Sequence, residues 1–294
     1  MDEAIKARAQ NQIFKVNAEL GCPSGKDASY SLDFEEREYR QKDLVGLIRD
    51  MVPYFALTEE EIACLHKSDW NKVSFTRISD AQPTKKGDYG ELLLYIILCI
   101  FYKSPKFVTK ARLRSSTREQ IKGFDCAHFS IEDNGGVKLW LGEAKFHATV
   151  SGAISSALKS INTNFTDISK VKAELKLLGG EIEVNKSLEP EHLDLLRSYT
   201  NGGRSLDKIP IQIPVLITYD SDCISELCGT EHADIDSSFF HEKLVEELDK
   251  NFASVYSRDW PTKRNITISF YLVPFKSVAD IKALLETVET AMKF

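Results

Sequence analysis

The most continuous apolar stretch in the chain runs over the 11 residues from Leu92 to Tyr102. A helix that spans a membrane needs about 20 apolar residues, so this stretch predicts a helix buried in a globular core. We expect the helix to cover residues 88–103, with Asp88 as its N-cap. The first residues of the chain contain no apolar segment typical of a secretory signal, which favours a cytoplasmic protein.

After this helix the apolar positions follow a period of two. This alternation predicts a strand over residues 107–114 and a hairpin whose strands cover 123–131 and 137–147. A further set of periodic segments follows the hairpin: a helix from about residue 151, a strand over 209–219, a helix over 242–256, a strand over 266–275 and a helix over 278–292. This order predicts an α/β fold with a mixed central sheet flanked by helices.

The chain is expected to consist of a core over residues 81–294 and an N-terminal extension over residues 1–80 that packs on it. Within the core, residues 166–208 read as a helical insertion. The extension contains a possible strand over 13–16 and a helix over 44–51 that should end near Pro53. A short helix should follow Thr58, because the sequence Thr-Glu-Glu-Glu is typical of a capping box.

The overall composition excludes several classes of protein without naming a function. Hydrophobic residues make up 43% of the 294 residues and charged residues 28%, which excludes collagen-like and disordered chains. Six cysteines without any CxxC spacing argue against a disulfide framework and against a thiolate zinc site. The expected setting is therefore a reducing compartment.

Positive charge is concentrated in one segment of an otherwise acidic chain. Residues 103–122 contain seven Lys or Arg and a single acid, whereas the rest of the chain has a net charge of −12. Such a stripe can bind a polyanion, because phosphates attract it and release their counterions. The alternative is a solvated strand and loop with no ligand.

Three carboxylates occupy positions where the pattern calls for apolar residues. Glu91 shares a helix face with Leu94, Tyr95 and Leu98, and a carboxylate on such a face loses its hydration and needs a partner. The other two, Asp125 and Glu143, lie in the two strands of the predicted hairpin.

The register of the hairpin decides whether Asp125 and Glu143 meet. A three-residue loop ending at Gly135 keeps the apolar residues of both strands on one face, since glycine can adopt the left-handed conformation that this loop requires. In that register Asp125 faces Glu143, and Lys145 points the same way from two residues further along. Two facing carboxylates repel each other unless a cation lies between them. We therefore expect a site for Mg²⁺ or Mn²⁺, against the alternative of structural ion pairing.

These residues resemble the motif of the PD-(D/E)XK nuclease superfamily. The matching segments are Gly90-Glu91, Gly123-Phe124-Asp125 and Gly142-Glu143-Ala144-Lys145. The resemblance implies a nuclease-like core that hydrolyses phosphodiesters with a divalent metal. It implies that Asp125 and Glu143 are metal ligands, that Lys145 is the catalytic lysine, and that Glu91 is an accessory ligand or water anchor.

A closer likeness extends over most of the chain. The segments over residues 86–94, 121–129 and 139–147 are similar to the HamA family, the effectors of the Hachiman antiphage defence system. This resemblance implies an endonuclease that acts on DNA and a helicase partner, HamB, that restrains it.

The basic stripe then has a role beside the predicted site. We expect a set of side chains to contact the DNA backbone without reading its sequence: Lys110, Arg112, Arg114, Arg118, Lys122 and, next to Lys145, His147. Two alternatives stay open: a catalytically inactive module that binds nucleic acid or a partner protein, and a homodimeric restriction enzyme that works alone.

Overall fold

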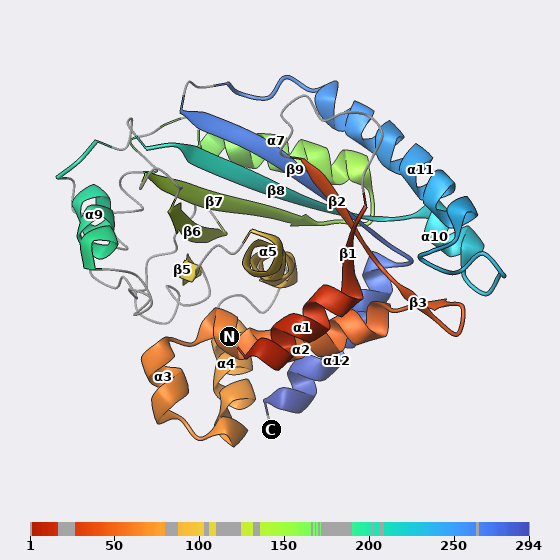
Figure 1. Ribbon diagram of the computed structural model, residues 1–294, viewed down its shortest axis with the longest axis horizontal. Coiled ribbons are helices and arrows are strands. Elements are labelled where there is room, and N and C mark those ends of the chain that lie inside the picture. Colours follow the sequence, from red (N-terminus) through yellow and green to blue (C-terminus); the bar gives the residue numbers. More distant parts are fainter. Residues whose placement is uncertain are drawn as a thin grey trace.

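The computed structural model describes residues 2–16, 27–79, 88–102, 106–109, 125–131, 136–165, 190–200, 203–205, 209–262 and 265–293, together with positions 167, 169 and 171. Within these residues a seven-stranded sheet has the order β1-β2-β9-β8-β7-β6-β5 (Figure 1). Strands β2, β9, β8 and β7 are parallel to one another, whereas β1, β6 and β5 are each antiparallel to their neighbours. Its strands are β1 (Ile13–Val16), β2 (Ala28–Leu32), β5 (Lys106–Thr109), β6 (Cys126–Ile131), β7 (Val137–Phe146), β8 (Ile211–Asp220) and β9 (Ile266–Phe275).

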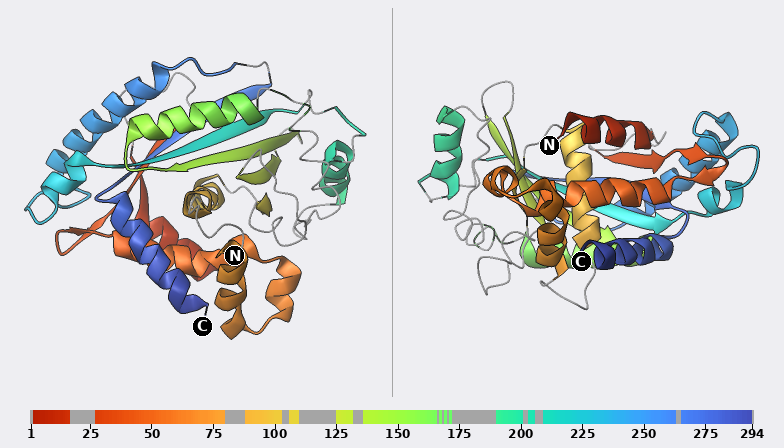
Figure 2. Two further views of the ribbon diagram at one scale, coloured as in Figure 1. Left: turned by 180° about the vertical axis from the view of Figure 1, so that it is seen from behind. Right: turned by 90° about the horizontal axis from the view of Figure 1, so that it is seen from below.

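Helices cover both sides of this sheet, which confirms the predicted mixed α/β architecture (Figures 1 and 2). On one side lie α7 (Val150–Asn164) and α11 (Ser238–Tyr256). On the other side lie α1 (Glu3–Gln12), α2 (Gln41–Ala56), α5 (Asp88–Phe101) and α12 (Val278–Met292). The shorter elements are the hairpin of β3 (Phe34–Glu35) and β4 (Glu38–Tyr39), α3 (Glu59–Cys64), the 3₁₀ turn Lys67–Asp69, α4 (Trp70–Ser79), α9 (Pro190–Thr200) and α10 (Asp222–Leu227).

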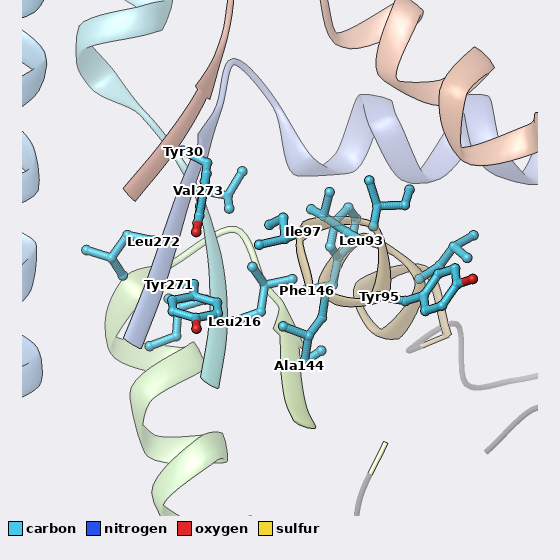
Figure 3. Close-up of a cluster of buried hydrophobic side chains, with 14 of the residues drawn as sticks. Tyr30, Leu93, Tyr95, Ile97, Ala144, Phe146, Leu216, Tyr271, Leu272 and Val273 are labelled. Atoms are coloured by element: carbon cyan, nitrogen blue, oxygen red, sulfur yellow. The ribbon is translucent and has the colours of Figure 1, made fainter. Parts of the chain in front are cut away.

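Helix α5 is the buried helix that the long apolar run predicts. Every residue from Leu92 to Leu98 is buried. Figure 3 shows Ala144 and Phe146 of β7 projecting towards this helix. The close approach depends on glycine, since a Cβ at Gly90 would lie 3.2 Å from the Cβ of Phe146 and 3.4 Å from that of Ala144. Burial of this apolar interface fixes the position of α5 on one face of β7.

The N-terminal strands belong to the central sheet. Strand β1 occupies the predicted residues 13–16 and pairs with β2, which in turn pairs with β9. The sequence pattern did not predict β2, because Ser29 and Ser31 interrupt its apolar positions although all five residues are buried. The hydroxyl of Ser29 donates a hydrogen bond of 2.7 Å to the carbonyl of Val16, which satisfies it inside the core.

The expectation that the second helix ends near Pro53 is wrong. Helix α2 continues through Pro53 to Ala56, and the N–H of Leu57 donates to the Pro53 carbonyl at 2.9 Å. Proline removes one helical hydrogen bond, but Val52, Phe55 and Ala56 are fully buried, and this burial stabilises the last turn. The capping box after Thr58 is confirmed in α3.

Candidate active site

The hairpin of β6 and β7 has the register that its apolar pattern predicts. Cys126 lies opposite Gly142, and the pairing continues without a shift to Ile131 opposite Val137. Asp125 immediately precedes β6, and its N–H donates to the Gly142 carbonyl at 3.0 Å. The next position in this register therefore brings Asp125 beside Glu143.

The Asp125 carboxylate is held by the neighbouring strand. The backbone N–H of Ala144 donates a 2.9 Å hydrogen bond to Oδ2 of Asp125. Asp125 is 8% exposed and Glu143 2% exposed, so both carboxylates are largely removed from water. The side chain of Ala144 points to the opposite layer, towards α5, as the strand alternation predicts.

Glu143 forms an ion pair with Lys145, whose side chain is 17% exposed. Burial and then the nearby negative charge of Asp125 raise the pKa of Glu143 to about 7, although the Lys145 ammonium and a hydrogen bond from Ser160 act against the rise. A raised pKa at a buried carboxylate means that one lysine does not compensate the negative charge at this point. Two carboxylates and one ammonium therefore share one small volume on the α7 side of the hairpin.

Ser160 is a site residue that the sequence reasoning missed. It lies on α7, its hydroxyl bonds to the Glu143 carboxylate, and the amide of Asn164 donates to that hydroxyl at 3.3 Å. The signal was present in the sequence, because Ala153, Ala157 and Ser160 form one stripe of the helix at the i, i+4, i+7 spacing. A polar residue that continues a buried stripe needs a hydrogen-bond partner, and here the partner is a site carboxylate.

Glu91 is buried, at 4% exposure, on the α5 side of the sheet. Burial raises the pKa of the Cys126 thiol, and the charges of Asp125 and Glu91 both add to this rise, which places the thiol near the two acids. The part of the chain that the structure describes contains no group of three or more His, Cys, Asp or Glu side chains arranged to hold a metal ion. The role of Glu91 as an accessory ligand or water anchor stays a prediction.

The structure describes one of the six predicted nucleic-acid contacts, His147. His147 follows β7 and is half-buried, and burial first, then the charges of Lys282 and Lys145, lower its pKa. The other five residues predicted to contact the DNA backbone lie outside the described residues: Lys110, Arg112, Arg114, Arg118 and Lys122. His128 is a fully buried core residue against the ring of Tyr95, on the face opposite to Asp125.

The donor chemistry of the site fits a hard divalent cation. The two buried carboxylates supply only oxygen atoms, and their mutual repulsion is the reason that a cation would be stabilised there. Mg²⁺ commonly binds through one or two carboxylates and keeps several waters, so a third protein ligand is not required. Asp125 and Glu143 are the residues that would hold such an ion.

Comparison with known proteins agrees with the resemblance seen in the motif segments. No helix among the described residues combines the length and the apolar character that crossing a bilayer requires. A search of curated proteins finds no match. The family model of HamA matches residues 11–288, which is nearly the whole chain. The chain therefore belongs to the HamA family and is a component of Hachiman antiphage defence.

Proposed function

We propose that this chain is a divalent-metal-dependent endonuclease that cleaves DNA with little sequence specificity. The observation that supports the proposal most directly is the meeting of Asp125, Glu143 and Lys145 at one point of the β6–β7 hairpin. Repulsive carboxylates are stabilised by a cation, and a lysine beside them can meet the charge that develops on a phosphate.

The reaction would be hydrolysis of a phosphodiester. A water oxygen forms a bond to phosphorus, the bond from phosphorus to the leaving sugar oxygen breaks, and the proton released by the water ends on that oxygen. A bound Mg²⁺ or Mn²⁺ would polarise the phosphate and lower the pKa of a coordinated water. Lys145 would donate its N–H groups to a non-bridging phosphate oxygen, and the Ala144 N–H and the Ser160 hydroxyl would keep the two carboxylates oriented.

DNA would be bound through its backbone. Phosphate contacts set affinity and register without reading bases, which is the reason we propose low sequence specificity. The basic segment over residues 103–122 is the candidate for these contacts, next to the hairpin in sequence. Membership of the HamA family supports a HamB-like helicase as the partner that restrains cleavage, in the cytoplasm.

A plasmid-nicking assay with Mg²⁺ or Mn²⁺ tests the nuclease proposal. Wild type should convert supercoiled plasmid to the nicked form, and each of three variants should lose this activity: Asp125→Ala, Glu143→Ala and Lys145→Ala. Equal cleavage by all four proteins would end the proposal. Adding the helicase partner should lower the wild-type rate, and an unchanged rate would remove the proposed restraint.

The ion pair of Glu143 with Lys145 favours a second candidate, a catalytically inactive module that binds nucleic acid or a partner protein. In that case the two charges would serve mainly to stabilise each other. Calorimetric titration with Mg²⁺ separates the candidates, because the inactive module binds DNA in a salt-dependent way but takes up no metal. Cleavage at defined sequences by a dimer without any partner would instead indicate a restriction enzyme.

A further inference from the structure

Three parallel strands end at the same edge of the sheet, close to the candidate active site. The register of β7, β8 and β9 brings their carboxyl ends together, and α7, α10 and α12 begin just beyond them (Figure 1). In open α/β sheets, ligands bind preferentially outside the carboxyl ends of parallel strands. Side chains that contact a substrate beyond the hairpin are therefore expected at this edge.

His147 leaves β7 at this edge and is fixed in place by its neighbours. Its carbonyl accepts a hydrogen bond of 3.1 Å from the hydroxyl of Thr218 on β8, and the next carbonyl, of Ala148, accepts one of 2.9 Å from the N–H of Asp220. The imidazole lies against the first turn of α7, since a Cβ at Gly152 would be 3.6 Å from Nδ1 of His147. The ring is thus held at the end of the strand that carries Glu143 and Lys145.

Lys282 reaches the same edge from α12, at the other end of the sequence. The first turn of α12 is anchored to the end of β8, because the N–H of Val278 donates to the Asp220 carboxylate at 2.6 Å. From the next turn, the ammonium of Lys282 lies 5.5 Å from the centroid of the Phe146 ring. Among the described residues Lys282 takes part in no ion pair. Its ammonium group lies over the aromatic ring of Phe146 instead of next to a carboxylate.

Lys145, His147 and Lys282 together form a basic cluster at the carboxyl end of β7. Lys282 lies over Phe146, the residue between Lys145 and His147, while the imidazole of His147 lies against α7, so the two basic side chains flank the end of β7 from its two sides. The positive charges of Lys282 and Lys145 both contribute to lowering the pKa of His147. Lys145 is paired with Glu143, whereas Lys282 has no ion-pair partner among the described residues. Two strand residues separate the Cα atoms of Lys145 and His147 by about 6.6 Å, which gives the cluster two positions along the strand at which a phosphate can bind.

We propose that His147 and Lys282 form a subsite for a second phosphate of the nucleic-acid backbone, next to the phosphate that is cleaved at Lys145. The inference rests on the proposed nuclease function and extends it by adding α12 to the DNA-binding surface. Lys282 supplies the charge, and the half-buried His147 supplies a ring N–H donor. The subsite would hold the strand in line with the hairpin carboxylates, which is a positioning role that carries no sequence information.

Binding of a fluorescent 20-base-pair duplex to the full chain, measured by anisotropy in EDTA over a range of salt concentrations, tests the subsite. Lys282→Gln keeps the aliphatic stem on Phe146 but removes the charge, and it should weaken binding several-fold at low salt and reduce the slope of log K against log salt by about 0.9. Lys282→Arg keeps the charge and should bind like wild type. Lys67→Gln is the matched control, because Lys67 also lies over an aromatic ring, that of Trp70, at 6.0 Å.

Three outcomes overturn the subsite. The first is an affinity and a salt slope of Lys282→Gln that equal those of wild type and Lys67→Gln. The second is a wild-type chain that does not bind the duplex at low salt. The third is a shift of the His147 NMR signals by inorganic phosphate at matched ionic strength but not by the duplex, which would assign the cluster to a small phosphorylated ligand.

The measurement stays separate from the nuclease test because EDTA prevents cleavage. Weakened binding by Lys282→Gln together with absent Mg²⁺-dependent nicking would support the subsite and contradict the nuclease. Nicking by wild type together with unchanged binding by Lys282→Gln would support the nuclease and contradict the subsite.

Discussion

The backbone N–H of Ala144 donates a hydrogen bond of 2.9 Å to the carboxylate of Asp125. The residue between Glu143 and Lys145 therefore orients the acid of the neighbouring strand, and the three functional side chains depend on one backbone geometry. This relationship separates the structural role of the Asp125 side chain from its chemical role.

Replacing Asp125 by Asn should preserve the fold and remove the activity. Asparagine keeps an oxygen that can accept the Ala144 N–H, whereas Asp125→Ala leaves that buried donor unpaired, at a cost of about 1–3 kcal/mol. We expect Asp125→Asn to unfold within about 1 kcal/mol of wild type in urea and to lose about 100-fold or more of the nicking rate. Nicking by Asp125→Asn at the wild-type rate would show that the carboxylate charge has no chemical role.

Replacing Ser160 by Ala should weaken the site without unfolding the chain. The Ser160 hydroxyl orients Glu143, and loss of such an outer hydrogen bond to a metal-binding carboxylate typically costs about 10–100-fold in metal affinity or activity. Calorimetric titration with Mg²⁺ and the nicking rate both measure the effect. Ser155→Ala, at an exposed position of the same helix, is the control. Equal metal affinity of the two variants would contradict a role for Ser160.

Replacing Gly142 by Ala should destabilise the core beneath the site. The new Cβ would lie 2.5 Å from Sγ of Cys126 and 2.8 Å from Cδ2 of Leu94, and overpacking of this kind costs about 1–3 kcal/mol. Urea denaturation measures the loss, and adding Cys126→Ala should restore part of it.

Gly46→Ala in α2 provides a matched control, because a Cβ there meets no atom within 4 Å. This change should stabilise the protein by about 0.5–1 kcal/mol, since alanine is the better helix former. A destabilised Gly46→Ala together with an unaffected Gly142→Ala would show that Leu94 of α5 and Cys126 do not pack closely on Gly142.

The metal-free protein should lose stability as the pH rises towards neutral because of Glu143. Burial and the Asp125 charge raise the pKa of Glu143 from 4.5 to about 7. Between these values the folded protein retains a proton that the unfolded chain has released, so the free energy of unfolding falls as the pH increases through this range. Above about pH 7 the loss is complete.

Glu143→Gln lacks this titration. The variant should therefore become more stable relative to wild type between pH 5 and pH 8, roughly, when both are unfolded by urea in EDTA. Glu246→Gln, at an exposed position of α11, controls for the change in net charge. A stability difference between wild type and Glu143→Gln that does not vary with pH would mean that Glu143 is ionised throughout.

Local sequence pattern was sufficient for the elements that carry the site. Apolar alternation with a period of two, together with one glycine-containing loop, predicted the register of β6 and β7. The structure has this register, with Cys126 opposite Gly142, and it brings Asp125 beside Glu143. Strand β9 and helix α12 also have the predicted bounds. These features follow from short-range rules, because a slip of one residue would move every apolar side chain of a strand to the wrong face.

Only the tertiary structure decided which distant segments join them. Burial of Phe55 and its neighbours carries α2 past Pro53, and the buried hydroxyl of Ser29 in β2 donates to the Val16 carbonyl of the neighbouring strand, a contact that no local pattern contains. Ser160 reaches the hairpin because α7 packs on β7 and β8, and Lys282 reaches it because α12 begins at the edge where β7 and β9 both end. Such contacts join residues far apart in the chain, and their free energy comes from packing and desolvation that exist only once the sheet has formed.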